Sequence, residues 1–242
     1  MTDRNNWLGS YQYAHRGLFD PSLNIIENSH SAFIRAEDHG YGIELDVQLS
    51  QDGQAMVFHD VELSRLTDEV GLLIDYSAEK LSQIQLKHSK DTIHTLQSQL
   101  SILNKQTPIL IEIKGDQHLY KDIACAVYEI VKDLDQPIAL MSFYPEILEQ
   151  LQSLGADHPL GLVATSDKSE KLPAQLTSQE HQIQLIDQLD LDFIAYNIQN
   201  LPNKLSDYCS QNDLPLLTWT VRTAAEHERA QHYANAPIFE RY

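Results

Sequence analysis

Positively charged residues are scarce in this chain of 242 residues. It holds 17 Lys and Arg against 35 Asp and Glu, which gives a formal net charge of −18 at pH 7. Proteins that bind nucleic acids or anionic membrane surfaces use Lys and Arg to neutralise phosphate groups. The composition therefore argues against a nucleic-acid partner. With 42% hydrophobic and 21% charged residues, it is otherwise typical of a folded globular protein.

Cysteine and long apolar runs are also rare. Cys125 and Cys209 are far apart and form no CxxC pattern, so we expect two reduced thiols rather than a disulfide. Residues 1–10 are polar and lack the apolar core of a secretory signal. No apolar run reaches the roughly 18 residues that a membrane span needs. These features predict a cytoplasmic protein without stable membrane insertion, and they carry no signal for an oligomeric state.

What the chain does contain is a regular alternation of short apolar runs and longer amphipathic segments. Because parallel strands need a crossover helix, this alternation predicts a parallel α/β sheet. The expected strands are 11–14, 43–49, 109–113, 138–141, 160–164, 193–196, 216–221 and 237–239. The expected helices are 29–39, 96–103, 121–134, 145–154, 179–189, 203–211 and 224–233. We predict one domain over 1–242, an eight-stranded (β/α)8 barrel of the TIM type, with an open doubly wound sheet as the alternative.

The segment between the second and third strands is too long for one loop and one helix. We expect a small insertion at about 60–90, which leaves the barrel beside His59. Segments of this kind are often lids or binding loops. Its apolar residues either cap a small pocket, which would favour water-soluble substrates, or only pack the insertion onto the barrel; they are Leu66, Leu72, Leu73, Ile74 and Tyr76.

Polar residues gather where the expected strands end, which is where a barrel of this type builds its site. Three of them are acidic. Glu44 and Asp46 are two residues apart on one strand, so their side chains point to the same face, and Glu112 lies on the next strand. Any one of them could be an ordinary solvated acid, but three converging carboxylates repel one another without a cation. Their oxygen-only chemistry favours a divalent metal, Mg²⁺ or Ca²⁺, over zinc.

Four further side chains at this rim suit phosphate chemistry. His15 and His59 can exchange protons near pH 7, although a strand-end histidine is often only structural. Arg16 offers a planar fork for a phosphate and Lys114 a point charge. One imidazole can take a proton from the nucleophile while the other protonates the leaving alkoxide. Together with a metal, these residues predict cleavage of a phosphodiester.

Ordered motifs recur over nearly the whole chain: Ala14-His15-Arg16-Gly17, Glu27-Asn28-Ser29, Glu44-Leu45-Asp46, His59-Asp60, Leu63-x-Arg65-x-Thr67, Glu112-Ile113-Lys114, Ser142-Phe143 and Thr218-Trp219-Thr220-Val221. Together they resemble the motifs of the glycerophosphodiester phosphodiesterase family. The resemblance implies a metal on Glu44, Asp46 and Glu112, with His15 and His59 as the acid and base. It also implies a small-molecule substrate, a glycerophosphodiester, which is cut to glycerol 3-phosphate and an alcohol. The resemblance leaves two nucleophiles open: water, or the neighbouring glycerol hydroxyl, whose attack forms a cyclic phosphate that water then opens.

Two places in the chain depart from the family pattern. Ile26 replaces a proline before the Glu-Asn pair. The segment 236–242 replaces a Thr-Asp-x-Pro segment, and this difference affects the contacts of the last strand.

Two residues have supporting roles in our interpretation. Glu27 is expected to orient Arg16, or else to be a helix-start carboxylate. Trp219 either walls the substrate pocket or belongs to the core.

Two alternative functions remain open at this point. The first is a lysophospholipase D or phospholipase D-like lyase on the same barrel, which a long apolar groove beside the metal would favour. The second is a catalytically silent phosphate-binding barrel. The presence of His15, His59, Lys114 and all three carboxylates argues against the silent barrel.

Overall fold

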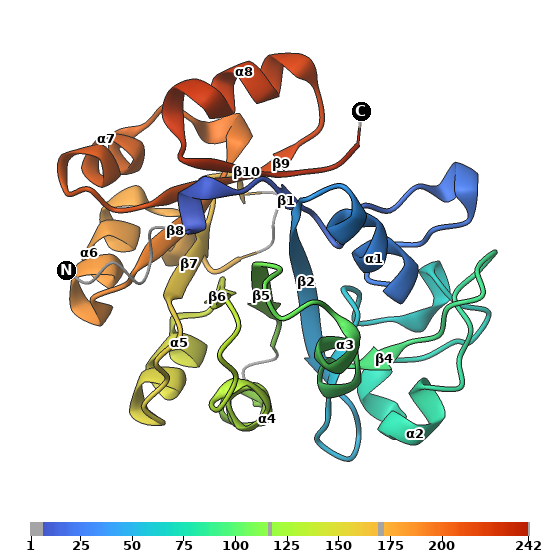
Figure 1. Cartoon of the computed structure of the whole chain (residues 1–242). Coiled ribbons are helices and arrows are strands. Elements are labelled where there is room, and N and C mark those ends of the chain that lie inside the picture. Colours follow the sequence, from blue (N-terminus) through green and yellow to red (C-terminus); the bar gives the residue numbers. More distant parts are fainter. Residues whose placement is uncertain (1–6, 116–117, 169–171, 242) are drawn as a thin grey trace.

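Eight parallel strands close into a barrel in the computed structural model, which describes residues 7–115, 118–168 and 172–241. The strand β1 pairs with both β2 and β10, so the sheet has no free edge there (Figure 1). This closure confirms the predicted (β/α)8 barrel and excludes the open doubly wound sheet. The barrel strands are β1 (Tyr13–Ala14), β2 (Gly42–Leu49), β5 (Ile109–Ile113), β6 (Ile138–Ser142), β7 (Leu160–Ala164), β8 (Phe193–Asn197), β9 (Leu216–Val221) and β10 (Ala236–Phe239).

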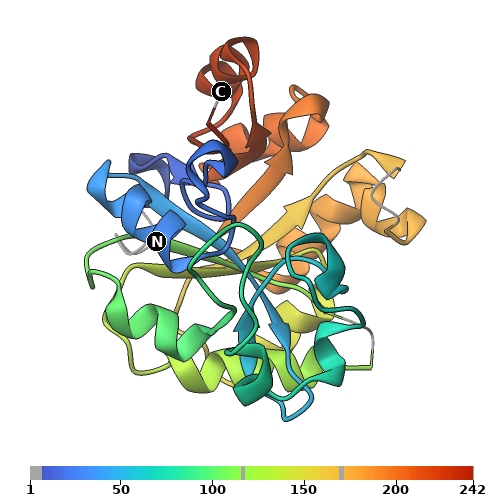
Figure 2. The same ribbon diagram turned by 90° about the vertical axis from the view of Figure 1, so that its right-hand side faces the viewer.

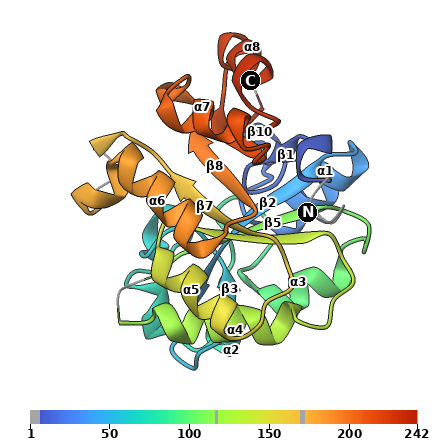
Figure 3. The same cartoon turned by 90° about the vertical axis from the view of Figure 1, so that its left-hand side faces the viewer.

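Helices connect these strands and cover the outside of the barrel, as Figure 3 shows for α4, α5 and α6. They are α1 (His30–Asp38), α3 (Leu96–Ile102), α4 (Tyr120–Val131), α5 (Pro145–Ser153), α6 (Gln179–Leu189), α7 (Lys204–Gln211) and α8 (Ala224–Tyr233). Short 3₁₀ turns are η2 (Leu8–Ser10), η3 (Pro21–Leu23), η7 (Ala174–Thr177) and η8 (Ile198–Asn200). The helix boundaries follow ordinary capping chemistry: the Ser29 side chain accepts a hydrogen bond from the Ala32 amide, and Pro145 begins α5.

Strand alternation separates two apolar layers. On β2, Ile43, Leu45 and Val47 face outward and pack with the helices in the larger core. On β5, Leu110 faces inward and belongs to a smaller core inside the barrel. Residues two apart share a face, so Glu44 and Asp46, which alternate with the outward residues of β2, lie on the inner side.

The insertion forms a small lobe beside β2 and α1 (Figures 1 and 2). It begins after β3 (Ala55–Val57), which runs antiparallel to β2, and it returns through β4 (His94–Thr95). Between them lie η4 (Leu63–Arg65), η5 (Leu73–Asp75) and α2 (Ala78–Leu81). The lobe has its own apolar core, in which Leu73 is 1% exposed and against which Leu66 and Tyr76 pack.

The apolar residues of the insertion do not all cap a pocket. For three of the five, the capping expectation is wrong. Leu66, Leu73 and Tyr76 stabilise the lobe itself. Leu72 and Ile74 line a cavity next to His59. The assignment of 1–242 to one domain stays a prediction.

Two other sequence expectations concern thiols and membranes. Cys125 and Cys209 are free thiols, and Cys209 is buried. Among the described residues, no helix combines the length and the apolar character needed to cross a bilayer.

Candidate active site

Three carboxylates meet at the inner face of β2 and β5. Asp46 on β2 is in register with Glu112 on β5, and Glu44 lies two residues before Asp46. Each offers an oxygen within 4.8 Å of the oxygens of the other two. All three are buried, with 1%, 0% and 7% exposure for Glu44, Asp46 and Glu112. The predicted cluster thus exists in space and not only in the sequence pattern.

Two cations balance part of this negative charge. Lys114 Nζ lies 2.9 Å from Asp46 Oδ1 and also contacts Glu112 Oε1. Arg16 Nε lies 3.3 Å from Asp46 Oδ2. Burial by itself raises the pKa of Asp46, but Lys114 and Arg16 outweigh burial and hold this pKa well below its usual range. The two cations therefore favour the ionised form of Asp46.

Glu44 has the opposite character. Its Oε2 accepts a hydrogen bond from the Arg16 backbone N–H at 2.8 Å, whereas its buried Oε1 has no hydrogen-bond partner among the residues that the structure describes. Burial, followed by the charges of Asp46 and Glu112, raises the pKa of Glu44 well above its ordinary value. An unsatisfied buried carboxylate oxygen facing two other carboxylates is the setting that a hard divalent cation would relieve. The donor set fits Mg²⁺ or Ca²⁺.

Asn28 positions Asp46, a role that the sequence reasoning missed. Its Nδ2 donates to Asp46 Oδ2 at 2.8 Å, and its Oδ1 accepts from the Asp46 amide at 3.2 Å. Asn28 has a φ of 55°, a left-handed conformation that asparagine tolerates better than most residues. The Glu27-Asn28-Ser29 motif could have indicated this role, because it places the side-chain amide of Asn28 just before α1.

The turn after β1 brings His15 and Arg16 to the barrel mouth. Arg16 and Gly17 have φ values of 57° and 78°, both in the left-handed region. A Cβ at Gly17 would lie 2.8 Å from Ala32 Cβ and from Phe33 Cδ1, so only glycine fits between this turn and α1. The Arg16 amide consequently points at Glu44. Strained turns of this kind are common at functional sites.

His15 is held by a residue from the other end of the chain. Its Nδ1 donates to Glu240 Oε1 at 2.8 Å, and Arg222 binds both oxygens of Glu240 at 2.7 and 2.8 Å. Burial raises the pKa of Glu240, but hydrogen bonds from His15 and Arg222 lower it to about 2. Burial lowers the pKa of His15 from its ordinary value, against the opposing effect of Glu240. A neutral His15 with its proton on Nδ1 leaves Nε2 free to accept a proton.

The sequence reasoning missed Glu240 and Arg222, although 236–242 was noted as a departure from the family pattern. Glu240 directly follows β10, as His15 directly follows β1. Because β1 and β10 are neighbours, the residues that follow them lie side by side. Because a closed barrel pairs its first strand with its last, the predicted barrel could have indicated the contact between His15 and Glu240.

His59 has a matching arrangement built from adjacent residues. Its Nδ1 donates to Asp60 Oδ1 at 2.8 Å, and Arg65 from the insertion also contacts Asp60. Although burial raises the pKa of Asp60, these hydrogen bonds hold it well below its ordinary value. Gln48 fixes the backbone here, since its Nε2 donates to the His59 carbonyl at 2.8 Å.

Glu27 links the two sides of the mouth. Its Oε1 accepts from Arg16 Nη1 and from Arg65 Nη2, both at 2.7 Å, and its Oε2 accepts from Arg65 Nη1 at 2.9 Å. The contact with Arg16 is the geometry expected for an orienting residue. The participation of Arg65 was missed, although the Leu-x-Arg-x-Thr motif contains it.

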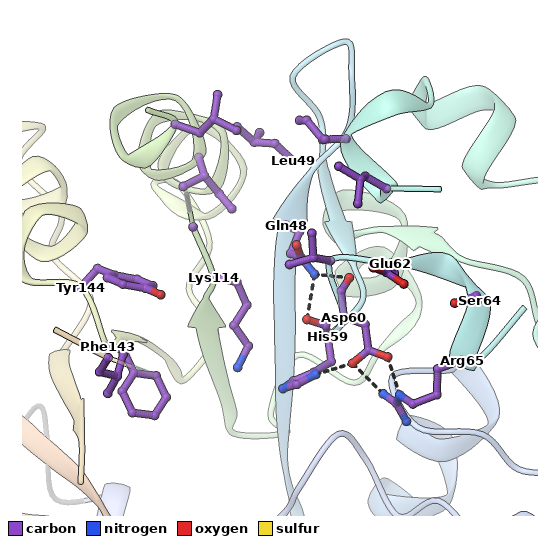
Figure 4. Close-up of a pocket in the computed structure, with 17 residues that line it drawn as sticks. Gln48, Leu49, His59, Asp60, Glu62, Ser64, Arg65, Lys114, Phe143 and Tyr144 are labelled. Carbon is purple, nitrogen blue, oxygen red and sulfur yellow. Dashed lines mark hydrogen bonds and ion pairs between the residues drawn. The ribbon is translucent and has the colours of Figure 1, made fainter. Parts of the chain in front are cut away.

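Two cavities meet at this mouth. The smaller, about 280 Å³, is bordered by His15, Glu44 and polar residues of the last strands. Trp219 is in its wall, where its ring meets Phe143 at 5.5 Å between centroids and its Nε1 donates to the Ala195 carbonyl at 2.8 Å. The larger cavity, about 840 Å³, is shown in Figure 4. His59, Lys114 and Phe143 border both.

A closed parallel barrel with carboxylates, histidines and cations at one mouth is the architecture of the (β/α)8-barrel enzymes. The chain therefore falls in that class. The profile of the glycerophosphoryl diester phosphodiesterase family matches residues 15–240, and the chain belongs to this family of phosphoric diester hydrolases.

Relatives and solved structures agree with this assignment. The chain is 28% identical over 226 residues to a glycerophosphodiester phosphodiesterase of Caldanaerobacter subterraneus subsp. tengcongensis, a match that covers 89% of this chain and 87% of the relative. It is 25% identical over 244 residues to human glycerophosphodiester phosphodiesterase 1, with 88% and 72% covered. A phosphodiesterase of Oleispira antarctica, solved with the product sn-glycerol-3-phosphate, has the same fold, with a TM-score of 0.81 at 21% identity over 95% of this chain and 92% of that one.

Proposed function

We propose that this chain hydrolyses glycerophosphodiesters to glycerol 3-phosphate and an alcohol, with a divalent metal, Mg²⁺ or Ca²⁺, as cofactor. The observation that carries the proposal is the convergence of the three-carboxylate cluster and two carboxylate-bound histidines on one barrel mouth. The relatives named glycerophosphodiester phosphodiesterase support the substrate class. The cytoplasmic location stays a prediction from the sequence.

The proposed metal site consists of Glu44, Asp46 and Glu112. A metal bound there supplies positive charge to the phosphoryl oxygens. Lys114 and Arg16 add positive charge at the same edge, because both contact Asp46. We assign them to the non-bridging oxygens of the phosphate, where fixed cations stabilise developing negative charge.

The two histidines divide the proton transfers according to the cavities they border. His15 borders the smaller, polar cavity, and its free Nε2 takes the proton from the attacking oxygen as that oxygen bonds to phosphorus. His59 also borders the larger cavity, and in its protonated form it gives a proton to the alcohol oxygen as its bond to phosphorus breaks. The attacking oxygen belongs either to water or to a glycerol hydroxyl. In the second case a cyclic phosphate forms first, and water opens it.

Release of glycerol 3-phosphate tests the proposal. The purified chain is incubated with glycerophosphocholine or glycerophosphoethanolamine, with Mg²⁺, with Ca²⁺ and with chelator. We expect metal-dependent release, and a loss of about 10²–10⁴-fold for His15→Ala or His59→Ala. His232→Ala is the matched control, because His232 is exposed on α8 and its Nδ1 bonds the Glu228 carbonyl of the same helix. Substrate binding without turnover under every metal condition would instead favour the catalytically silent barrel.

A further inference from the structure

A largely apolar groove runs from the catalytic mouth between the insertion and the loops that follow β5 and β6. Its volume of about 840 Å³ is in the upper part of the range of roughly 300–1,000 Å³ for ligand sites. Its polar residues cluster at the end near His59, whereas Leu49 lies toward the other end (Figure 4). The apolar wall includes Leu49, Leu72, Ile74, Leu119, Ile123 and Tyr144.

The groove is continuous with the catalytic site. His59, Lys114 and Phe143 border both the groove and the smaller cavity. On its other side, the smaller cavity presents polar groups suited to hydroxyls, among them Asn197 and Gln199. A phosphodiester centred on the carboxylate cluster would therefore place a compact polar half in the smaller cavity and its other half in the groove.

We propose that the groove binds the alcohol half of the substrate and selects alcohols with an apolar chain over those with an anionic one. This inference rests on the proposed function and specifies its substrate class. Two cations lie at the catalytic end of the groove wall, and both are already paired: Lys114 with Asp46 and Glu112, and Arg65 with Asp60 and Glu27. Glu62 at the wall and the net charge of −18 also disfavour an anionic chain end.

The mouth of the groove has the surface that a protruding chain requires. Val61 and Leu72 line the groove and are also 60% and 38% exposed. These exposed apolar side chains give a chain that leaves the groove an apolar surface to contact. The small capped pocket expected from the sequence does not match this geometry, because Leu73 packs inside the insertion and leaves the groove open.

Chain length of the alcohol is the first test. KM and kcat are measured for glycerophosphoethanol and glycerophosphooctanol, below the concentration at which the longer substrate aggregates. A fully buried methylene is worth about fourfold in binding. Because some of the chain stays exposed, we expect KM to fall by at least about tenfold from ethanol to octanol. Equal KM values for the two substrates would overturn the inference and leave the proposed function standing.

Charged substitutions in the groove are the second test. Leu72→Glu is expected to remove most of the difference between the two substrates, and Val61→Glu provides a second variant at an exposed position if the first does not fold. Val70→Glu is the matched control: Val70 is 73% exposed on the same insertion, does not line the groove, and should leave both substrates unchanged. An undiminished preference for octanol in both groove variants would contradict the assignment.

Two further experiments test which half of the substrate enters the groove, and whether the inference holds if the proposed function fails. Lysophosphatidylcholine carries its chain on the glycerol half, so faster turnover of this lipid than of glycerophosphooctanol, with sensitivity to Leu72→Glu, would overturn the placement of the halves. If no diester is hydrolysed with any metal, the proposed function fails. Calorimetric binding of the two synthetic diesters in chelator then still decides the inference: tighter binding of glycerophosphooctanol supports it, and equal binding overturns it.

Discussion

Replacement of Glu240 tests whether the contact between the ends of β1 and β10 controls His15, the proposed catalytic base. Glu240→Ala removes the carboxylate that accepts from His15 Nδ1 at 2.8 Å. A hydrogen bond to a charged group contributes about 1.5–3 kcal/mol. If this stabilisation acts on the reactive form of His15, its loss lowers kcat by about 10- to 100-fold, since about 1.4 kcal/mol corresponds to one factor of ten. Glu240→Gln keeps an acceptor oxygen and should recover part of the rate.

The pH profile distinguishes this positioning role from a merely structural one. The Glu240 carboxylate raises the pKa of His15 against the larger effect of burial, so its removal lowers that pKa further. The acidic limb of kcat/KM should therefore move to lower pH in Glu240→Ala. Arg241→Gln is the control, because Arg241 is the neighbouring residue but pairs with Asp20. A wild-type rate with an unmoved acidic limb in Glu240→Ala would refute the reasoning.

Unfolding measurements give an independent check. The pKa of Glu240 falls from 4.5 to about 2 in the folded chain, so folding favours its ionised form. This shift corresponds to an upper figure of about 3 kcal/mol. The stabilisation is present above 4.5, the pKa of Glu240 in the unfolded chain, and it is lost as the pH falls toward 2. The stability gap between wild type and Glu240→Gln should therefore be widest at neutral pH and close between about pH 4.5 and 2, as followed by denaturant unfolding; a constant gap would contradict the linkage.

Three further predictions concern the metal, the histidines and the insertion. Asp46→Asn removes one charge from the proposed metal site, so the metal concentration for half-maximal activity should rise; a metal titration checks this, and an unchanged midpoint would argue against the site. The double variant His15→Ala/His59→Ala should be little slower than the slower single variant, because the two histidines act as one unit; multiplicative losses in turnover assays would indicate independent roles. Leu73→Ala should destabilise the chain by about 2–5 kcal/mol in denaturant unfolding, since Leu73 is 1% exposed in the insertion core; a loss below 1 kcal/mol would mean that the lobe tolerates the cavity.

The fold was predictable because each strand of the barrel produces its own local pattern. Apolar runs such as 109–113 are buried on both faces, and helix starts such as Ser29 and Pro145 follow capping rules that act over a few residues. The three-carboxylate cluster was predictable for the same reason. Alternation along β2 places Glu44 and Asp46 on one face, and the next barrel strand supplies Glu112.

The contacts that escaped prediction join segments without a local pattern. Glu240 reaches His15 only because the barrel closes, and Arg65 reaches Glu27 only because the insertion folds back on the mouth. Which apolar residues of the insertion are buried depends on how the lobe folds, and this could not be predicted from the sequence. Composition marks Leu72 and Leu73 as equivalent, and tertiary packing buries one and leaves the other in a groove wall.

The contact between His15 and Glu240 joins residues that are 225 positions apart in the chain. Contacts of such high sequence separation form only after the entropy of ordering the intervening chain has been overcome. A partly folded chain in which β10 has not yet paired with β1 lacks this contact, even if the other strands are in place. The orienting pair thus forms only when the barrel closes between β1 and β10, and hydrolytic activity can serve as a reporter of barrel closure in refolding experiments.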